Sequence, residues 1–197
     1  VLMDEPLTVI DPDLKFRLRR NLKEINEQYK TTLVYVTHDQ NEAMTFAENI
    51  IVMDQGEIVQ VGLPKDLFEK PKTTFVGYFI GSPAMNIFHS TVSSDYEVKI
   101  NDTTIKTNSN LGNLKDKNVK LGIRSEFIEL AAKERSNTIK IKLTRVEDFG
   151  NFKLLTGKMG DIVVKSKVER EKPIPDGELN LYFPPEKCCV YSDEKLV

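Results

Sequence analysis

The periodicity of apolar residues changes once along the chain, near residues 81–83, and this change limits the folds available to it. Before that point, apolar side chains in "DPDLKFRLRRNLKEINEQY" (11–29) recur at the spacing of one helix face. After it, short runs alternate apolar and polar residues, as in "TIKIKLTRVE" (138–147), with Asn, Asp, Gly and Pro between the runs. Many short strands at regular spacing indicate a small closed barrel or a sandwich. We therefore predict two domains, an α/β domain at 1–81 and an all-β domain at 82–197.

The first 81 residues are expected to alternate strands with helices. Val1–Met3 is predicted to be the end of a buried strand. "TTLVYVTHD" (31–39) is predicted to be a short strand of the fully buried type, because it is β-branched without polar alternation. Asp11 and Pro12 suit the cap and the first position of a helix. Further predicted elements are a helix through Glu42–Ala47, a hairpin around Gln55–Gly56, and short helices within 63–71 and 73–81.

Composition and charge exclude several classes of protein. The 197 residues carry a net charge of -2, which argues against nonspecific binding of nucleic acids. No apolar run approaches the roughly 20 residues that cross a bilayer. The two cysteines are neighbours, Cys188 and Cys189, an arrangement unsuited to an unstrained disulfide or to a complete zinc site. We therefore expect structural thiols and a reducing, cytoplasmic setting.

Two carboxylates and one histidine are the candidate chemical groups. Asp4 and Glu5 follow an apolar strand, and His38 ends the next strand. An aspartate in this position can hold Mg²⁺ through water beside nucleotide phosphates, and a following glutamate can polarise the attacking water. His38 could contact a γ-phosphate. Taken singly, an Asp-Glu pair after an apolar run is more often a helix cap or a solvated acidic pair, and a histidine at a strand end is more often structural.

Taken in order, these segments resemble the C-terminal half of an ABC transporter ATPase domain. The resemblance implies that Asp4 is the Walker B aspartate that binds Mg-ATP, Glu5 the catalytic glutamate and His38 the switch histidine. It also implies that Leu7–Asp11 is the D-loop, with Asp11 as its aspartate, although Val9 and Ile10 depart from the usual residues there. "QGEIVQVGLPKDLFEKP" (55–71) is similar to the hairpin and helix that follow in that family.

Later segments are similar to one group of these ATPases, the sugar-type importers that include the maltose and glycerol-3-phosphate systems. "FVGYFIGSPAMNIF" (75–88) resembles the junction of that group, and "LGIRSEFIEL" (121–130) its "GIRPE" segment, with Ser125 in place of proline. The implied fold is a partial P-loop NTPase domain of α/β class followed by an all-β, OB-like transport-associated (TOBE) barrel with a regulatory or dimerising role.

Two motifs of the family do not occur in the sequence. There is no GxxxxGK[ST] loop to cradle phosphates and no LSGGQ-like segment. We therefore expect the chain to be the C-terminal part of a longer ATP-binding subunit and to be inactive by itself. The resemblance implies that the intact subunit uses ATP and Mg²⁺ and pairs with a second ATPase subunit as a homodimer or paired subunit. It also implies contact with transmembrane permease subunits at the cytoplasmic face of the membrane.

Two other hypotheses concern residues 82–197. The barrel could act as a stand-alone regulatory or dimerisation module that binds a regulatory protein or an effector. It could also bind oligonucleotides, as some OB folds do through aromatic platforms and basic grooves. The sequence has no Trp. Lys115, Lys117 and Lys120 cluster, but Asp116 and Glu126 lie close by, so a solvated face is expected and no nucleic-acid partner is predicted. His89 has no other metal-ligating residue at suitable spacing and is interpreted as structural.

Overall fold

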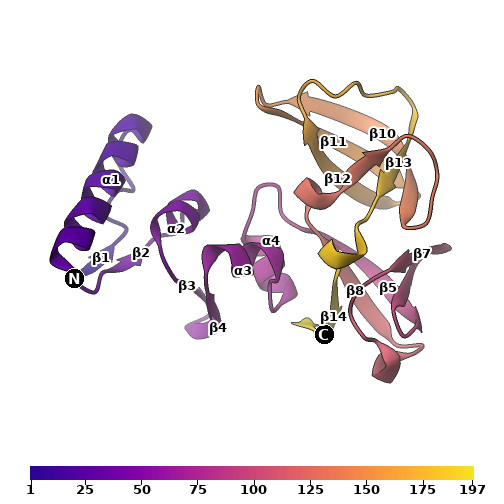
Figure 1. The fold of residues 1–197 in the computed structure, drawn as a ribbon, viewed down its shortest axis with the longest axis horizontal. Coiled ribbons are helices and arrows are strands. Elements are labelled where there is room, and N and C mark those ends of the chain that lie inside the picture. The colour runs from indigo at the N-terminus through magenta and orange to yellow at the C-terminus, as the bar shows by residue number, and fades with distance from the viewer.

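The computed structural model describes all residues from Val1 to Val197 and is elongated (Figure 1). The N-terminal helix lies at one end and the barrel at the other, and the shorter helices lie between them. The elements of the N-terminal part are β1 (Leu2–Asp4), α1 (Pro12–Tyr29), β2 (Val34–Val36), α2 (Gln40–Phe46), β3 (Ile50–Asp54), β4 (Glu57–Gly62), α3 (Pro64–Glu69) and α4 (Thr74–Phe79).

The local signals at helix starts and turns are confirmed. The Asp11 carboxylate accepts a hydrogen bond from the Asp13 backbone N–H at 3.0 Å and caps α1, which begins at Pro12. Strands β3 and β4 form an antiparallel hairpin, and both of its turn residues, Gln55 (φ 48°) and Gly56 (φ 84°), lie in the left-handed region. These turn conformations match the type of hairpin connection that the sequence predicts.

The predicted burial of the first two strands is wrong. β1 and β2 pair in parallel, but Leu2 is 74% exposed and Val34 is 50% exposed. No residue of α1 is buried, although Leu14 and Ile25 lie on its apolar face. The physical reason is that a sheet of two short strands with one helix has no further layer to cover its faces.

A small core holds the middle of the chain together. It joins the hairpin to α3 and α4 through Ile50, Val52, Leu67, Val76 and Ile80. Fully burying an aliphatic side chain of this size contributes about 1.5–3 kcal/mol. The hairpin and the two short helices therefore form a packed unit, in contrast to β1, β2 and α1.

The predicted alternating runs beyond residue 82 are all strands. The structure adds two very short strands, Glu129–Ala131 and Lys195–Leu196, which have too few residues to show a periodicity. The strands are β5 (Asn86–Ser94), β6 (Glu97–Ile100), β7 (Thr103–Lys106), β8 (Asn118–Ile123), β9 (Glu129–Ala131), β10 (Thr138–Asp148), β11 (Phe152–Met159), β12 (Ile162–Glu169), β13 (Glu178–Tyr182), β14 (Cys189–Ser192) and β15 (Lys195–Leu196), with 3₁₀ turns at Gly112–Leu114, Ser125–Phe127 and Pro185–Lys187.

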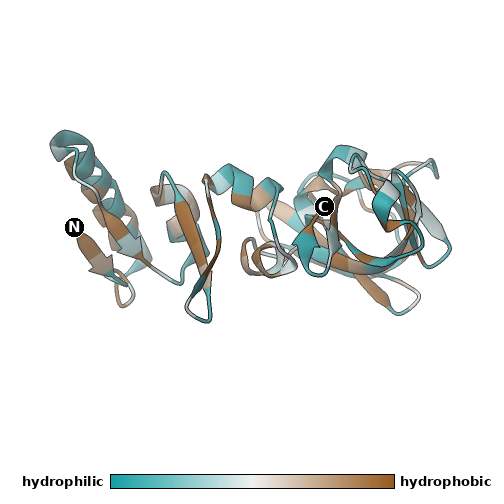
Figure 2. Ribbon diagram, turned by 90° about the horizontal axis from the view of Figure 1, so that it is seen from below, coloured by the Kyte–Doolittle hydropathy of each residue, from teal (hydrophilic) through white to brown (hydrophobic).

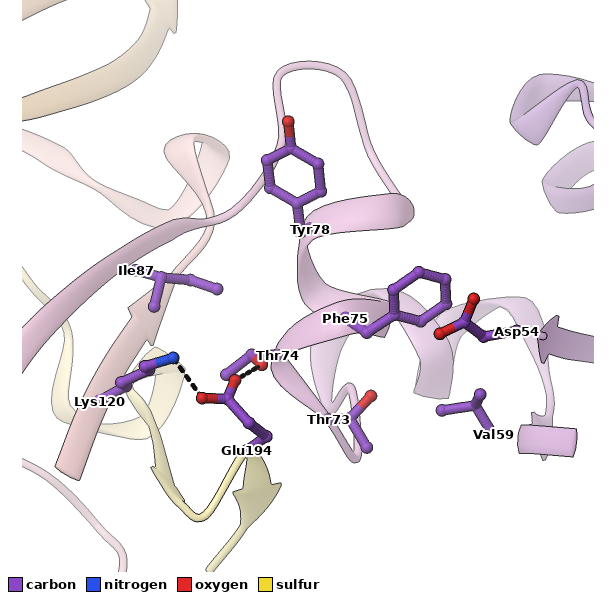
Figure 3. Close-up of a pocket in the computed structure, with 9 residues that line it drawn as sticks. All are labelled: Asp54, Val59, Thr73, Thr74, Phe75, Tyr78, Ile87, Lys120 and Glu194. Atoms are coloured by element: carbon purple, nitrogen blue, oxygen red, sulfur yellow. Dashed lines mark hydrogen bonds and ion pairs between the residues drawn. The ribbon is translucent and has the colours of Figure 1, made fainter. Parts of the chain in front are cut away.

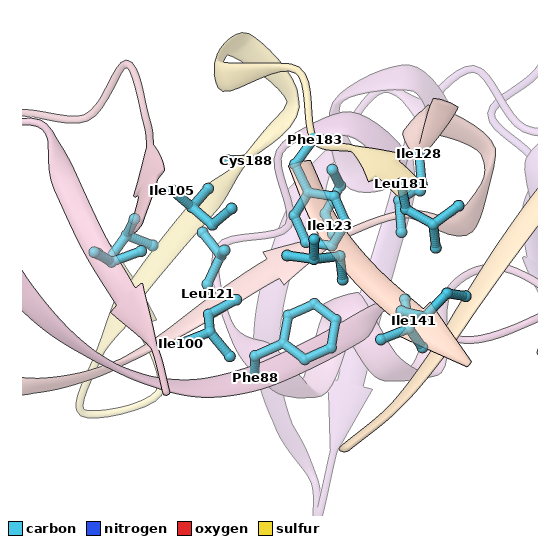
Figure 4. Close-up of a cluster of buried hydrophobic side chains, with 14 of the residues drawn as sticks. Phe88, Ile100, Ile105, Leu121, Ile123, Ile128, Ile141, Leu181, Phe183 and Cys188 are labelled. Atoms are coloured by element: carbon cyan, nitrogen blue, oxygen red, sulfur yellow. The ribbon is translucent and has the colours of Figure 1, made fainter. Parts of the chain in front are cut away.

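These strands form two sheets that enclose one core. The sheet orders are β12-β11-β10-β13-β9 and β15-β14-β8-β5-β6-β7, and Figure 2 shows the strands arranged around a ring. A single cluster of 20 buried residues lies between the sheets (Figure 4). Within it, the rings of Phe88 and Phe183 stack with their centroids 5.8 Å apart. The OB-like all-β fold expected for this part is confirmed.

The barrel contacts α3 and α4, here called the linker helices, through a buried arginine. Arg124 follows β8, is fully buried, and donates from Nε to the Phe68 carbonyl and from Nη1 to the Gly77 carbonyl, both at 2.9 Å. Nη1 also donates to the Ile80 carbonyl. A Cβ on Gly81, whose φ is +101°, would lie 2.8 Å from Nη1. The guanidinium thus joins the C-terminal ends of α3 and α4 to the barrel.

The two cysteines are free and buried in different clusters, Cys188 just before β14 and Cys189 as its first residue. Cys188 packs in the barrel core, whereas Cys189 packs with Met85 and Tyr191. Burial raises the pKa of the Cys188 thiol to about 12. Both side chains therefore act as small apolar groups in this fold.

Candidate active site

Parallel pairing of β1 and β2 brings the candidate carboxylate and histidine together. Asp4 is paired with Val36, and the Glu5 backbone N–H donates to the Val36 carbonyl at 2.9 Å. Both strands therefore end at the same edge of the sheet, where Glu5 and His38 emerge. His38 Nδ1 lies 2.6 Å from Glu5 Oε1, although the two residues are 33 positions apart in the sequence.

The contact between Glu5 and His38 shifts the pKa of both side chains. The hydrogen bond from His38 is the main cause that lowers the pKa of Glu5, and the Thr8 hydroxyl adds a second bond to Oε2 at 3.1 Å. The same contact raises the pKa of His38. Glu5 has a positive φ of 43°, a conformation that non-glycine residues adopt at some cost. The site thus holds an ionised carboxylate against an imidazole at an exposed edge.

The other two candidate residues, Asp4 and Asp11, have different surroundings. Asp4 is exposed, and its carboxylate makes no hydrogen bond or ion pair within the chain. Asp11 is engaged in capping α1. Mg²⁺ bound beside nucleotide phosphates takes one or two carboxylates and keeps several waters, so the free carboxylate of Asp4 fits such an ion. The chain has no cluster of three acidic, histidine or cysteine side chains that could hold a metal ion by itself.

A buried carboxylate beside the histidine was not singled out by the sequence analysis. Glu42 lies on α2 with 3% exposure and accepts hydrogen bonds from the hydroxyls of Tyr35 and Thr37, both at 3.0 Å. The spacing "DQNE" (39–42) is typical of a capping box, in which the glutamate turns back to the cap residue. Asp39 does cap α2, but Glu42 turns toward β2 instead.

A separate pocket lies between the linker helices and the barrel. Its volume is about 450 Å³, and Figure 3 shows Glu194 between Lys120 and Thr74, to which it is bound. Lys120 also lowers the pKa of Glu194. Lys120, one of the clustered lysines expected on a solvated face, is therefore in an ion pair with Glu194. None of the candidate residues of the nucleotide site lines this pocket.

Comparisons with known proteins agree with these features. The family model "MalK OB fold domain" matches residues 81–128. The sn-glycerol-3-phosphate import ATP-binding protein UgpC of Yersinia enterocolitica is 35% identical over 98% of this chain and 55% of its own length. The sulfoquinovosyl glycerol transport ATP-binding protein SmoE of Agrobacterium fabrum is 33% identical over 94% of this chain and 53% of its own. The chain is similar to ABC importer ATP-binding subunits over nearly its whole length.

This relationship confirms the resemblance predicted from the motifs. UgpC of Pectobacterium atrosepticum is also 36% identical over 93% of this chain and 52% of its own length. The chain therefore spans about half the length of the curated relatives it matches. A solved structure of the molybdate-binding protein ModG aligns with 54% of the chain and 94% of its own at a TM-score of 0.45 and 13% identity. None of the helices is both long and apolar enough to span a bilayer.

Proposed function

We propose that this chain is the C-terminal part of the ATP-binding subunit of an ABC importer for sugars or related solutes, and that the intact subunit hydrolyses ATP. The observation that carries the proposal is the contact between Glu5 and His38, 2.6 Å apart, at the carboxyl edge of the parallel strands β1 and β2. Ligands of open α/β sheets bind at that edge. The relatives named as import ATP-binding proteins support the same function.

Each candidate residue has a distinct role in this proposal. Glu5 is ionised and accepts the proton of the attacking water as it forms its bond to phosphorus. His38 is assigned a contact with the γ-phosphate. Asp4 would hold Mg²⁺ through water, and the ion would supply positive charge beside the phosphates. Asp11 is proposed to fix the D-loop through its cap on α1. The 197 residues contain no phosphate-binding loop, so the chain alone is expected not to hydrolyse ATP.

The proposal includes the division of the chain and its partners. Residues 1–81 are assigned to the ATPase domain and residues 82–197 to an OB-like regulatory or dimerisation domain. We assign to the intact subunit a second ATPase subunit, transmembrane permease subunits at the cytoplasmic face of the membrane, and a regulatory protein or effector at the barrel. A stand-alone regulatory module is disfavoured, because similarity to the relatives extends over 98% of the chain and so includes the first domain.

The test is a Glu5→Gln substitution in the full-length subunit. The change removes the group that accepts the proton but keeps Asp4, so turnover is expected to fall at least about a hundredfold, within the range for a general base. ATP affinity, measured by calorimetry, is expected to remain within about twofold, since this base is not assigned a binding contact. Glu27→Gln is the matched control, because Glu27 is exposed on α1 and has no ion pair. Turnover that survives Glu5→Gln would remove Glu5 from its assigned role.

A further inference from the structure

We propose that Glu42 is a positioning residue that holds the loop Thr37–Asp39, and with it His38, against Glu5 and ties this loop to α1. Its importance for catalysis rests on the function proposed above, whereas the positioning stands on contacts within the chain. Glu42 contacts neither Glu5 nor His38 by hydrogen bond, so it acts through its neighbours.

The burial of Glu42 requires partners for its charge. Only 3% of the residue is exposed, and an unpaired buried carboxylate would be strongly unfavourable. Oε2 accepts two hydrogen bonds, from the Tyr35 and Thr37 hydroxyls. Oε1 accepts no hydrogen bond and lies 3.5 Å from Lys15 Nζ. The carboxylate is therefore bound by Tyr35 of β2 and by Thr37 just beyond it, and it faces a cation of α1.

The Tyr35 hydroxyl is a permanent donor in this arrangement. Burial, with the neighbouring charge of Glu42 as a further cause, raises the pKa of Tyr35 to about 12. The hydroxyl therefore keeps its proton at neutral pH and donates to the carboxylate. The ring of Tyr35 also packs against Phe46 with centroids 5.1 Å apart, which fixes β2 on α2.

The second donor lies in the histidine loop itself. The Thr37 hydroxyl donates to Glu42 and accepts a hydrogen bond from the Asp39 backbone N–H, both at 3.0 Å. His38 lies between these two residues, so the network restricts the backbone on each side of it. Lys15 follows Asp11 by one turn of α1, the helix after the proposed D-loop. The Glu42 carboxylate therefore connects this helix with the loop Thr37–Asp39.

The first experiment measures hydrogen exchange of the Asp39 amide in the 197-residue chain. Tyr35→Phe removes one donor to Glu42 and keeps the ring, and Glu42→Gln removes the charge that faces Lys15. Each is expected to speed exchange of the Asp39 amide roughly five- to tenfold, the effect of one weakened hydrogen bond. Exchange in β3 and β4 should not change. Glu48→Gln, an exposed residue just beyond α2, is the matched control and should have no effect.

The second experiment measures steady-state ATPase kinetics in the full-length subunit. Glu42→Gln is expected to lower kcat about tenfold with ATP affinity unchanged, because it displaces His38 without touching the nucleotide. A merely structural role would lower the amount of folded protein but leave kcat per folded molecule as it was. Glu42→Asp keeps the charge but shortens the side chain. It is expected to restore only part of the activity that Glu42→Gln loses.

The outcomes separate this proposal from the proposed function. Unchanged exchange of the Asp39 amide in both Tyr35→Phe and Glu42→Gln would overturn the positioning of the loop. Faster exchange with unchanged kcat would overturn its catalytic importance, provided that Glu5→Gln abolishes turnover. If Glu5→Gln itself retained turnover, the proposed function would fail, while the exchange result would still decide whether Glu42 positions His38.

Discussion

Glu5 and His38 alter each other's ionisation, and this can be measured residue by residue. The contact with Glu5 raises the pKa of His38, so Glu5→Gln is expected to bring that pKa back toward 6.5. The chain has only two histidines, so the ring signal of His38 can be assigned and followed in an NMR titration. An unchanged pKa of His38 in the Glu5→Gln variant would mean that the two side chains do not interact in solution.

The same pair gives a defined pH window for its contribution to stability. The raised pKa of His38 stabilises the fold below the unfolded value of 6.5, and this contribution is lost as the pH rises through the folded pKa. The lowered pKa of Glu5 stabilises above 4.5 and loses its effect as the pH falls. Both contributions are fully present between pH 4.5 and 6.5. The difference in unfolding free energy between wild type and Glu5→Gln, measured in urea, should therefore be greatest in this window.

Among the secondary-structure elements, α3 and α4 depend on one side chain of the barrel for their C-terminal carbonyls. Arg124→Met keeps much of the side-chain volume but leaves the carbonyls of Phe68, Gly77 and Ile80 without their donor. We expect the free energy of unfolding to fall by about 3 kcal/mol, as for the loss of buried hydrogen bonds to a charged group. Arg17→Met, on the exposed face of α1, is the control.

The denaturation midpoint of Arg124→Met can contradict the expected loss of stability. Burial lowers the pKa of Arg124, which reflects the desolvation of its charge. Replacing such a charge by an apolar group can be neutral when the partners find other bonds. An unchanged midpoint in Arg124→Met would thus show that the linker carbonyls are satisfied in another way. Gly81→Ala, which places a Cβ 2.8 Å from Nη1, should also destabilise the junction.

Signals from neighbouring residues in the sequence predicted most helices, strands and turns. The contacts that were not predicted join residues far apart in the sequence. The Asp11 cap and the Gln55–Gly56 turn depend on neighbours in the sequence, and both are confirmed. The partners of Arg124 lie 44 to 56 residues away, and Glu42 turns from its expected cap toward a strand. No periodicity reports such contacts.

The candidate site was predictable only in part. The sequence placed Glu5 after one predicted strand and His38 at the end of the next, and the structure shows that their side chains lie 2.6 Å apart. The apolar character of β1 and β2 predicted burial, which is wrong here, because burial depends on how many layers surround a strand. The roles of Asp4 and Asp11 remain predictions.

For the whole molecule, burial is distributed unevenly from one end to the other. The barrel encloses one cluster of 20 buried residues, the hairpin and linker helices share a cluster of five, and α1 has no buried residue. Regions with few buried apolar contacts open at lower free energy than the core. The N-terminal end is therefore expected to open while the barrel stays folded.

Limited proteolysis with trypsin tests this order of opening. Lys15, Arg17 and Lys23 offer cleavage sites along α1, and we expect the first cut there, followed by a stable product that contains the barrel. Cys188 and Cys189 report on the barrel, because both thiols are buried and should stay unreactive toward a thiol reagent while α1 is cut. Thiol labelling that keeps pace with cleavage of α1 would instead show that the molecule opens as one cooperative unit.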